Sequence, residues 1–517
     1  MKLERADLWI VLWFFTLALA LRFFSPIMLT SPANGLITNC VHSTPVDAAG
    51  HLGTLCGLAY PYQMAGSDGT PARGEVFDEI HFADAAHGYL KGLGCLPDYA
   101  EPGLEFCDPE PPLAKELIAA GEWGDGKWRQ LTEGARGDPA DLGFNTFGWR
   151  IMVCIFGSLV VPLMYLLAFG LWPNRWFAAT AAFLCCLDGM FFVQSRIAML
   201  DIFPIFFIML SYTLFLFHLR SQRWSSSLLT LMLTGIALGL AISTKWIALA
   251  ALASIGFFLA ARVGLTYLNR ERRSVSLPEN LPGNVPPTLY IGTAAMALLA
   301  IPAAVYTLSW LPFFFWGRMH SLGDLVSYQF QLYDWLASFT GSHPFASKWY
   351  TWPFLYRPVL YYSGDLGLDG YGQSLVAKII DLGNPIIWWA SILAILSLPY
   401  FLFKKRSWAA AVILVGFITQ YFPFVRVIRM TFLYYMFGAL IFMILALAFV
   451  LARIHQSEGK IFFRWPGLAE RVSVQKLVLP GFLILTVLFF SYFYPIWSGE
   501  PLGNSDWLSR MWFPSWM

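Results

Sequence analysis

The chain has 517 residues, of which 57% are hydrophobic and only 13% charged, with a formal net charge of +2 and a mean hydropathy of +0.57. This composition is far more apolar than that of a soluble domain of similar length. It excludes an ordinary soluble protein, and we expect a chain that lies in a lipid bilayer.

Eleven segments are long and apolar enough to cross a membrane as helices, since about 20 mainly apolar residues span about 30 Å of hydrocarbon. They lie near residues 7–24, 148–171, 175–193, 197–217, 226–242, 245–267, 287–308, 386–403, 407–425, 431–451 and 477–495. The apolar run of the first segment is long for a signal peptide, so we predict a retained anchor.

The positions of Lys and Arg predict the orientation, because short cytoplasmic loops are enriched in these residues. Placing the N-terminus inside puts the basic groups of the short connections between helices in the cytoplasm, among them Arg270, Arg272 and Arg273. An odd number of spans then leaves the C-terminus outside.

This topology divides the chain into six regions. They are a first transmembrane helix (1–24), an outer loop (25–147), helices two to seven (148–308), a second outer loop (309–385), helices eight to eleven (386–495) and an outer tail (496–517). We expect the chemistry in the two large outer loops.

The first outer loop is acidic, with 17 Asp or Glu against 6 Lys or Arg. Its cysteines, Cys40, Cys56, Cys95 and Cys107, form an even set on the oxidising face, which favours disulfides but leaves three pairings open. Near its end, "PPLAKELIAAGEW" (111–123) opens with proline and places leucine and isoleucine on one face. We predict a short helix lying on the membrane surface there.

The stretch "EVFDEIHFADAA" (75–86) sets Asp78 and Glu79 side by side in the same loop. Asp78 is a plausible cap for a helix that begins there. Alternatively, one carboxylate accepts a proton from a hydroxyl nucleophile. Asp78, Glu79, His81 and His87 also offer metal ligands without a specific pattern, so the sequence requires no cofactor and leaves a divalent metal undecided.

Several cations depart from the inside-positive pattern at the outer ends of predicted helices. Arg150, Arg196, Lys245 and Arg426 belong to helices far apart in the sequence. Each alone is explained by the anchoring of a helix end. Together we expect them to bind one lipid phosphate, because cationic side chains donate strong hydrogen bonds to such an anion.

The second outer loop is rich in aromatic residues and proline, as in "SHPFASKWYTWPFLYRPVLYY" (342–362). Trp and Tyr favour the boundary between water and lipid, so we predict that this loop lies against the bilayer.

Several motifs, ordered along the chain, resemble the protein O-mannosyltransferase family. "DEIHF" (78–82) is similar to the family's Asp-Glu pair followed by valine or isoleucine and His-Phe. "DPEPPLAK" (108–115) is similar to its Asp-x-His-Pro-Pro-Leu-Gly-Lys pattern, with Glu110 and Ala114 replacing histidine and glycine. "FVQSRIAMLD" (192–201) resembles its Gln-Ser-Arg segment, and "STKWIAL", "SHPFASKWYTWP", "LGNPIIWW" and "MWFPSW" follow in order.

This resemblance implies an all-α polytopic membrane protein of the GT-C fold that moves mannose, with inversion, from a polyprenyl phosphate to Ser or Thr of exported proteins. It implies Asp78 as the catalytic base with Glu79 in support, and Arg150 as a phosphate contact. Arg196, Lys245 and Arg426 rest on the topology alone. The further candidates lie in or beside the similar motifs: His81, Asp108, Lys115, His343 and Lys348.

The second outer loop is too short for the β-trefoil domain of fungal and animal relatives, so we expect a bacterial plasma-membrane enzyme. Its expected partners are the donor lipid, Ser- or Thr-containing acceptor proteins, surrounding lipids and, since family members pair, a second copy. No nucleic-acid partner is expected.

Other functions remain open at this stage. One is a lipid-linked sugar transferase that acts on a lipid or a glycan. A multi-pass transporter is less favoured, because its charges would gather near the bilayer midplane. A scaffold without catalysis is a third alternative.

Overall fold

The computed structural model describes residues 3–23, 76–93, 110–268, 285–338, 341–368, 374–457, 462–463 and 472–517. Ten helices within these ranges are long and apolar enough to cross a membrane. They are built from α1 (Arg5–Phe23), α6 (Thr146–Leu171), α9 (Ile202–Arg220), α10 (Trp224–Thr244), α11 (Leu249–Leu268), α12 (Pro287–Ala295) continued by η4 (Met296–Ala300) and α13 (Ile301–Ser309), α16 (Pro385–Phe403), α17 (Trp408–Tyr421), α18 (Phe437–Gln456) and α19 (Val474–Ser498).

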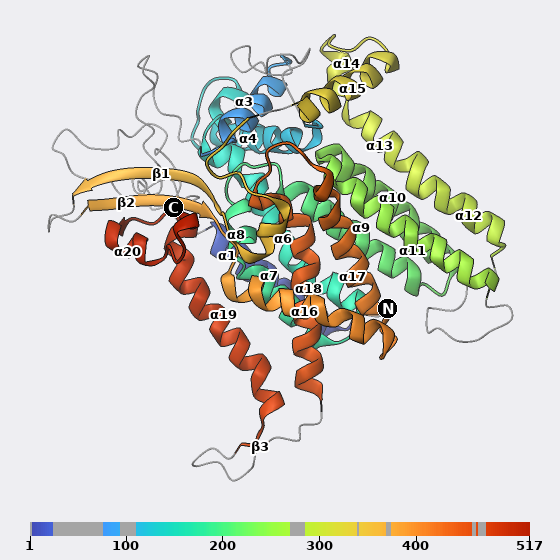
Figure 1. Ribbon diagram of the computed structural model, residues 1–517. Helices are drawn as coiled ribbons and strands as arrows, with labels where there is room; N and C mark the ends of the chain where they lie inside the picture. Colours follow the sequence, from blue (N-terminus) through green and yellow to red (C-terminus); the bar gives the residue numbers. More distant parts are fainter. Residues whose placement is uncertain are drawn as a thin grey trace.

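Burial separates the inner helices from the lipid-facing ones. The most apolar window of α18 is 89% buried and that of α9 is 78% buried, whereas the values are 17% for α12–α13 and 22% for α19. A helix that is apolar on every side and buried belongs to the centre of a bundle. Figure 1 shows α18 in the middle, α10 to α13 along one flank and α19 leaning away on the other.

The third predicted span, residues 175–193, is not one continuous helix. Residues 175–194 form α7 (Arg175–Cys186) and α8 (Gly189–Gln194) instead. The side chain of Asp188 causes the break, because its Oδ1 accepts hydrogen bonds from the backbone N–H of Met190 and Phe191, which starts a new helix.

The two pieces together still follow the full length of α1. Arg175 donates to Asp7 near the start of α1 (2.8 Å), and Arg22 near its end donates to the Ser195 hydroxyl (2.7 Å). Helix α6 runs the opposite way, since Tyr165 near its C-terminus also donates to Asp7 (2.8 Å). We call the two ends of the bundle the Asp7 end and the Arg22 end.

Elements of the two predicted outer loops gather at the Arg22 end. They are α3 (Glu79–Leu90), α4 (Leu113–Thr132), α5 (Pro139–Gly143), α14 (Leu311–Phe315), α15 (Leu322–Ser338) and η5 (Trp349–Phe354). Figure 1 shows α3, α4, α14 and α15 together at the top of the bundle.

Helix α4 starts after the two prolines as predicted but continues nine residues past the expected end at 123. Gly126, in the part of α4 beyond residue 123, allows the helix to pack closely against α5, because a Cβ on Gly126 would lie 1.8 Å from the Pro139 carbonyl oxygen.

The protein is mostly helical, as expected, and the described residues add two small β-sheets. Strands β1 (Val359–Leu368) and β2 (Ser374–Asp381) form an antiparallel hairpin, and β5 (Leu502–Gly503) pairs with the free side of β2. A second small ladder joins β3 (Phe462–Phe463) and β4 (Val472–Ser473). Aromatic and β-branched residues between glycine-rich turns are the sequence signal that was missed.

The remaining short elements connect spans or close the C-terminus. They are η2 (Trp246–Ala248), η6 (Phe422–Arg426), η7 (Leu433–Met436), α20 (Asn504–Ser509) and η8 (Pro514–Trp516). Trp516 donates from its indole to the Leu355 carbonyl (2.6 Å), so the tail folds back beside η5. The four cysteines of the first outer loop lie outside the described residues.

Candidate active site

Asp78 lies at the N-terminus of α3, directly after a residue with unusual backbone geometry. Phe77 has φ +53°, in the left-handed region that side chains other than glycine seldom adopt. Asp78 occupies the N-cap position and is half-buried, but its carboxylate makes no capping hydrogen bond. The reading in which Asp78 serves only as a helix cap is therefore wrong.

Glu79 has a different environment from its neighbour. It is wholly buried and accepts hydrogen bonds from Arg150 Nε of α6 (2.7 Å), from the backbone N–H of Val76 (2.7 Å) and from the backbone N–H of Ala198 (2.7 Å). A second Arg150 nitrogen pairs with the other carboxylate oxygen. Glu79 thus ties α3 to α6 and to the segment before α9.

Lys245, between α10 and η2, is the centre of a charged cluster at the same end. Its Nζ lies 2.9 Å from Asp201 Oδ1 and 3.6 Å from Glu110 Oε1. The ammonium also lies 6.0 Å from the centre of the Tyr435 ring, and the Arg429 guanidinium lies 5.7 Å from that ring. Lys115 is fully buried and donates to the Glu110 carbonyl oxygen (2.6 Å). Two cations therefore share one aromatic ring beside two carboxylates.

The charges of this cluster act on one another. Burial raises the pKa of Glu110, while the neighbouring Lys245 and Lys115 lower it by less. For Lys245, burial lowers the pKa, but Asp201 and Glu110 outweigh burial and raise it overall. The ammonium therefore stays charged across the physiological pH range.

A buried polar network connects this cluster to Asp78. Tyr361 of β1 and Asp381 of β2 hydrogen-bond each other and Gln194 of α8. Burial, followed by the charges of Asp381, Asp201 and Asp78, raises the pKa of the Tyr361 hydroxyl. Asp78 and Asp201 of the Lys245 cluster therefore both lie within electrostatic reach of the Tyr361 hydroxyl.

These network residues were not among the predicted site residues, although Gln194 lies within a family-like motif. A single Asp in the apolar run "AKIIDLG" (377–383) is the only sequence signal for Asp381. Tyr361 lies in an aromatic stretch and has no distinguishing neighbour in the sequence.

His343 also lies close to the start of α3. Its ring meets the Phe77 ring edge to face at 6.4 Å, and its Nδ1 accepts from the Phe345 backbone N–H (3.2 Å). Burial lowers the pKa of His343, which favours the neutral imidazole with the proton on Nε2. Lys348, five residues on, is exposed at the start of η5.

The other predicted cations are separated from one another. Arg196 is fully buried, lies 4.1 Å from the Phe192 ring and donates to the Trp497 carbonyl, and burial lowers its pKa to about 9. Arg426 is exposed at the end of η6, and His81 is exposed on α3. Asp108 lies outside the described residues.

The metal ligands considered from the sequence do not gather. His87 stacks on Phe144 and lies between Glu122 (3.7 Å) and Asp141 (3.4 Å), on the side of α3 that faces α4 and α5. Within the described ranges, no group of three or more His, Cys, Asp or Glu is arranged to hold a metal ion.

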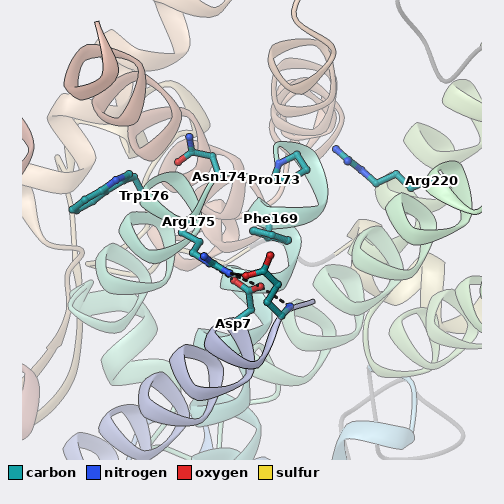
Figure 2. A pocket seen from close by; sticks show the side chains of 8 residues that line it. Asp7, Phe169, Pro173, Asn174, Arg175, Trp176 and Arg220 are labelled. Atoms are coloured by element: carbon teal, nitrogen blue, oxygen red, sulfur yellow. Dashed lines mark hydrogen bonds and ion pairs between the residues drawn. The ribbon is translucent and has the colours of Figure 1, made fainter. Parts of the chain in front are cut away.

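A separate cavity of about 610 Å³ lies at the Asp7 end. Figure 2 shows Arg175 reaching from α7 towards Asp7 of α1, while Arg220 faces the same space from α9. Its charged groups pair locally, with Arg175 bonded to both Asp7 and Glu4. This cavity and Asp78 are at opposite ends of α1.

Comparison with solved structures gives the fold. The chain superposes on a chain of the Saccharomyces cerevisiae protein O-mannosyltransferase complex bound to its sugar donor with a TM-score of 0.70 and 14% identity, covering all of this chain and 93% of the other. It superposes on the archaeal oligosaccharyltransferase of Archaeoglobus fulgidus with a TM-score of 0.50 and 14% identity, over 98% of this chain and 57% of the other. The protein thus has the GT-C fold of these multi-pass membrane proteins.

Sequence comparison narrows this class. Residues 73–316 match the profile described as dolichyl-phosphate-mannose-protein mannosyltransferase, and residues 321–516 match the C-terminal four-helix membrane region of protein O-mannosyltransferases. Polyprenol-phosphate-mannose–protein mannosyltransferases from Mycobacterium tuberculosis and Corynebacterium glutamicum are each 28% identical, over 87% of this chain and 87% and 89% of their own lengths. The chain belongs to the protein O-mannosyltransferase family.

Proposed function

We propose that this enzyme transfers mannose from a polyprenyl phosphate to a Ser or Thr hydroxyl of a protein, at the Arg22 end of the bundle. Its bacterial relatives are named for transfer from polyprenol-phosphate-mannose to protein. The observation that supports the residue assignment is the half-buried Asp78 carboxylate at the start of α3, which lies within electrostatic reach of the same tyrosine hydroxyl as Asp201 of the Lys245 cluster.

Asp78 is the proposed general base. It takes the proton from the acceptor hydroxyl while the hydroxyl oxygen forms a bond to the anomeric carbon of mannose. The bond from that carbon to the phosphate oxygen breaks, and its electron pair leaves with the lipid phosphate. Attack from the side opposite to the leaving group inverts the anomeric configuration.

Lys245 and Arg429 are the proposed contacts of the departing phosphate. Both cations lie against the Tyr435 ring, and Lys245 has three N–H donors, so it can bind a phosphate oxygen while it keeps an acidic partner. Preorganised cations at the position of developing charge stabilise a transition state strongly.

Arg150 has a different proposed role from the one the family motif implies. Its guanidinium engages Glu79 through two nitrogens, and both side chains are wholly buried. We assign this pair to positioning: it holds α3, and with it Asp78, against α6. Arg196 and Arg426 stay predictions as phosphate contacts, one deeply buried and one peripheral.

The orientation is also part of the proposal. Asp78 and the N-terminus belong to opposite ends of α1, since Arg22 bonds Ser195 close to Ala198, which binds Glu79. With the N-terminus in the cytoplasm, as the basic loops indicate, Asp78 faces the outer side of a bacterial plasma membrane, where exported acceptors pass.

The test uses the full-length protein reconstituted in lipid with polyprenyl phosphomannose and a Ser/Thr-rich peptide. Wild type adds hexose to the peptide, read by mass. Asp78→Asn lowers the rate by a factor of about 10² to 10⁴, as removal of a general base does, and leaves thermal unfolding unchanged. Near-wild-type transfer by this variant would remove Asp78 from the base role, and absence of hexose transfer by wild type would overturn the function.

A further inference from the structure

Tyr361 occupies an irregular position in the β-hairpin. Leu360 pairs with Ile380 and Tyr362 pairs with the adjacent Ile379, so Tyr361 is the extra residue of a β-bulge in β1. A bulge turns a side chain away from the regular alternation of a strand, and bulges are frequent beside active sites. Here it directs a nearly fully buried tyrosine towards α8 and the start of α3.

The Tyr361 hydroxyl is held by two groups from different elements. Gln194 Nε2 donates to it at 2.6 Å and to Asp381 Oδ2 at 3.1 Å, and the hydroxyl donates to the same Asp381 oxygen at 3.2 Å. The two side chains are 0% exposed. Gly189 permits this meeting, since a Cβ there would lie 2.2 Å from the Leu382 carbonyl oxygen that follows β2.

The ring of the same tyrosine supports the residue before the base. It stacks on Phe77 with ring centres 4.5 Å apart and planes inclined by 22°. Phe77 has φ +53°, and a left-handed conformation in such a residue persists only where its surroundings hold it. Without this support, Phe77 is free to relax towards an ordinary φ, which would shift the adjacent Asp78.

We propose that Tyr361 is a positioning residue of the transfer reaction: Gln194 and Asp381 fix its hydroxyl, and its ring holds Phe77 so that Asp78 faces the acceptor hydroxyl. The proposal rests on the assignment of Asp78 as the base. It adds a polar anchor, built from α8, β1 and β2, to the Glu79–Arg150 pair on the opposite side of α3.

The protonation of Asp381 is part of this anchor. In the described part of the chain, two buried acceptor atoms, Asp381 Oδ1 and Gln194 Oε1, have no hydrogen-bond partner. An ionised Asp381 supplies no hydrogen at this place, whereas a protonated Asp381 supplies one. Burial, against the opposing hydrogen bonds from Gln194 and Tyr361 and with the added charges of Asp188 and Asp201, raises the pKa of Asp381 to about 8. The titratable groups that face it are Tyr361, Asp188, Asp201 and Tyr434. Asp381 therefore acts as a neutral acid at pH 7.

The experiment compares kcat and the donor KM of reconstituted full-length variants in the peptide assay. Tyr361→Phe keeps the ring but loses its anchor, and we expect kcat to fall about tenfold with the donor KM within about twofold; Tyr361→Ala loses about 10²-fold, because small displacements of a catalytic group are costly. Tyr165→Phe is the matched control. It removes an equivalent bond from a buried tyrosine to Asp7 at the other end of the bundle and leaves kcat unchanged.

Asp381→Asn separates positioning from catalysis. Asparagine is neutral and can donate, so we expect a kcat within about threefold of wild type at pH 7, and a smaller loss of rate above pH 8 than in wild type, where Asp381 ionises. A loss of 10² or more at pH 7 would make Asp381 an ionised participant and overturn the inference.

The two proposals fail in distinguishable ways. A wild-type kcat for Tyr361→Phe, in a membrane where Asp78→Asn is inactive, would refute the positioning role and leave the base intact. Activity in Asp78→Asn would refute the base itself. Equal thermal unfolding of Tyr361→Phe and Tyr165→Phe ensures that a lower kcat reports geometry and not loss of folded protein.

Discussion

Asp78 and Glu79 should differ in how much stability is lost when each is replaced by the matching amide, Asn or Gln. Glu79 accepts hydrogen bonds from both Arg150 nitrogens and from the backbone N–H groups of Val76 and Ala198, all in a dry environment. In Glu79→Gln, one oxygen becomes an NH₂ group that faces two donors, and Arg150 loses its counter-charge. Breaking a buried ion pair in this way costs about 3–5 kcal/mol of unfolding free energy.

Asp78→Asn removes a charge from a half-buried side chain that makes no capping bond. We expect it to cost less than Glu79→Gln, because asparagine matches aspartate in size and the side chain is only half-buried. Activity distinguishes the pair less well, because both variants lose transfer. The stability of the folded protein is therefore the property that distinguishes the two variants, because Glu79 belongs to a buried ion pair with Arg150.

The assay is thermal unfolding of each purified variant in the same detergent, with wild type and Asp78→Asn as references. The double variant Glu79→Gln/Arg150→Met removes the uncompensated cation and leaves the mismatch at one backbone N–H, so its cost should fall to about 1–3 kcal/mol. High salt should change these differences little, since buried pairs are weakly screened. Glu79→Gln as stable as Asp78→Asn would refute this reading of the ion pair.

Two further predictions concern the donor and the pH dependence. Lys245→Ala should raise the donor KM about 10- to 100-fold, which corresponds to the loss of one hydrogen bond to a charged group. The control Lys348→Ala, at an exposed lysine, should leave the donor KM within about twofold of wild type. Equal donor titrations for the two variants would contradict the phosphate role of Lys245. Burial raises the pKa of Glu116 in α4 from 4.5 to about 7, so the folded state holds this proton more tightly than the unfolded state. The free energy of unfolding should therefore fall as the pH rises from about 4.5 to about 7, and thermal unfolding at pH 5 and pH 8 should differ less in Glu116→Gln, with an unchanged difference counting against this cause.

The membrane topology was largely predictable, because crossing a bilayer imposes length and apolarity on each segment separately. The failure at 175–193 has a specific cause. Hydropathy counts apolar residues, but the Asp188 side chain starts a new helix by accepting hydrogen bonds from the backbone N–H of Met190 and Phe191. Its other carboxylate oxygen accepts from the Asn384 backbone N–H and the Trp388 indole, about 200 residues away, and these contacts hold it in a buried position. The β1–β2 hairpin was missed because the aromatic and proline content of 342–362 resembled that of an interfacial loop.

The sequence alone determined that the protein is a multi-pass membrane enzyme, and its motifs singled out Asp78 and Glu79, since apolar spacing and a short motif are local properties. Only the tertiary structure decided what each carboxylate does. Glu79 accepts hydrogen bonds from Arg150 and from Ala198, 119 residues further along the chain, whereas the Asp78 charge acts on Tyr361 of β1. Contacts between distant segments form only when the helices pack. These contacts determine that Glu79 is fully buried while its neighbour Asp78 is half-buried.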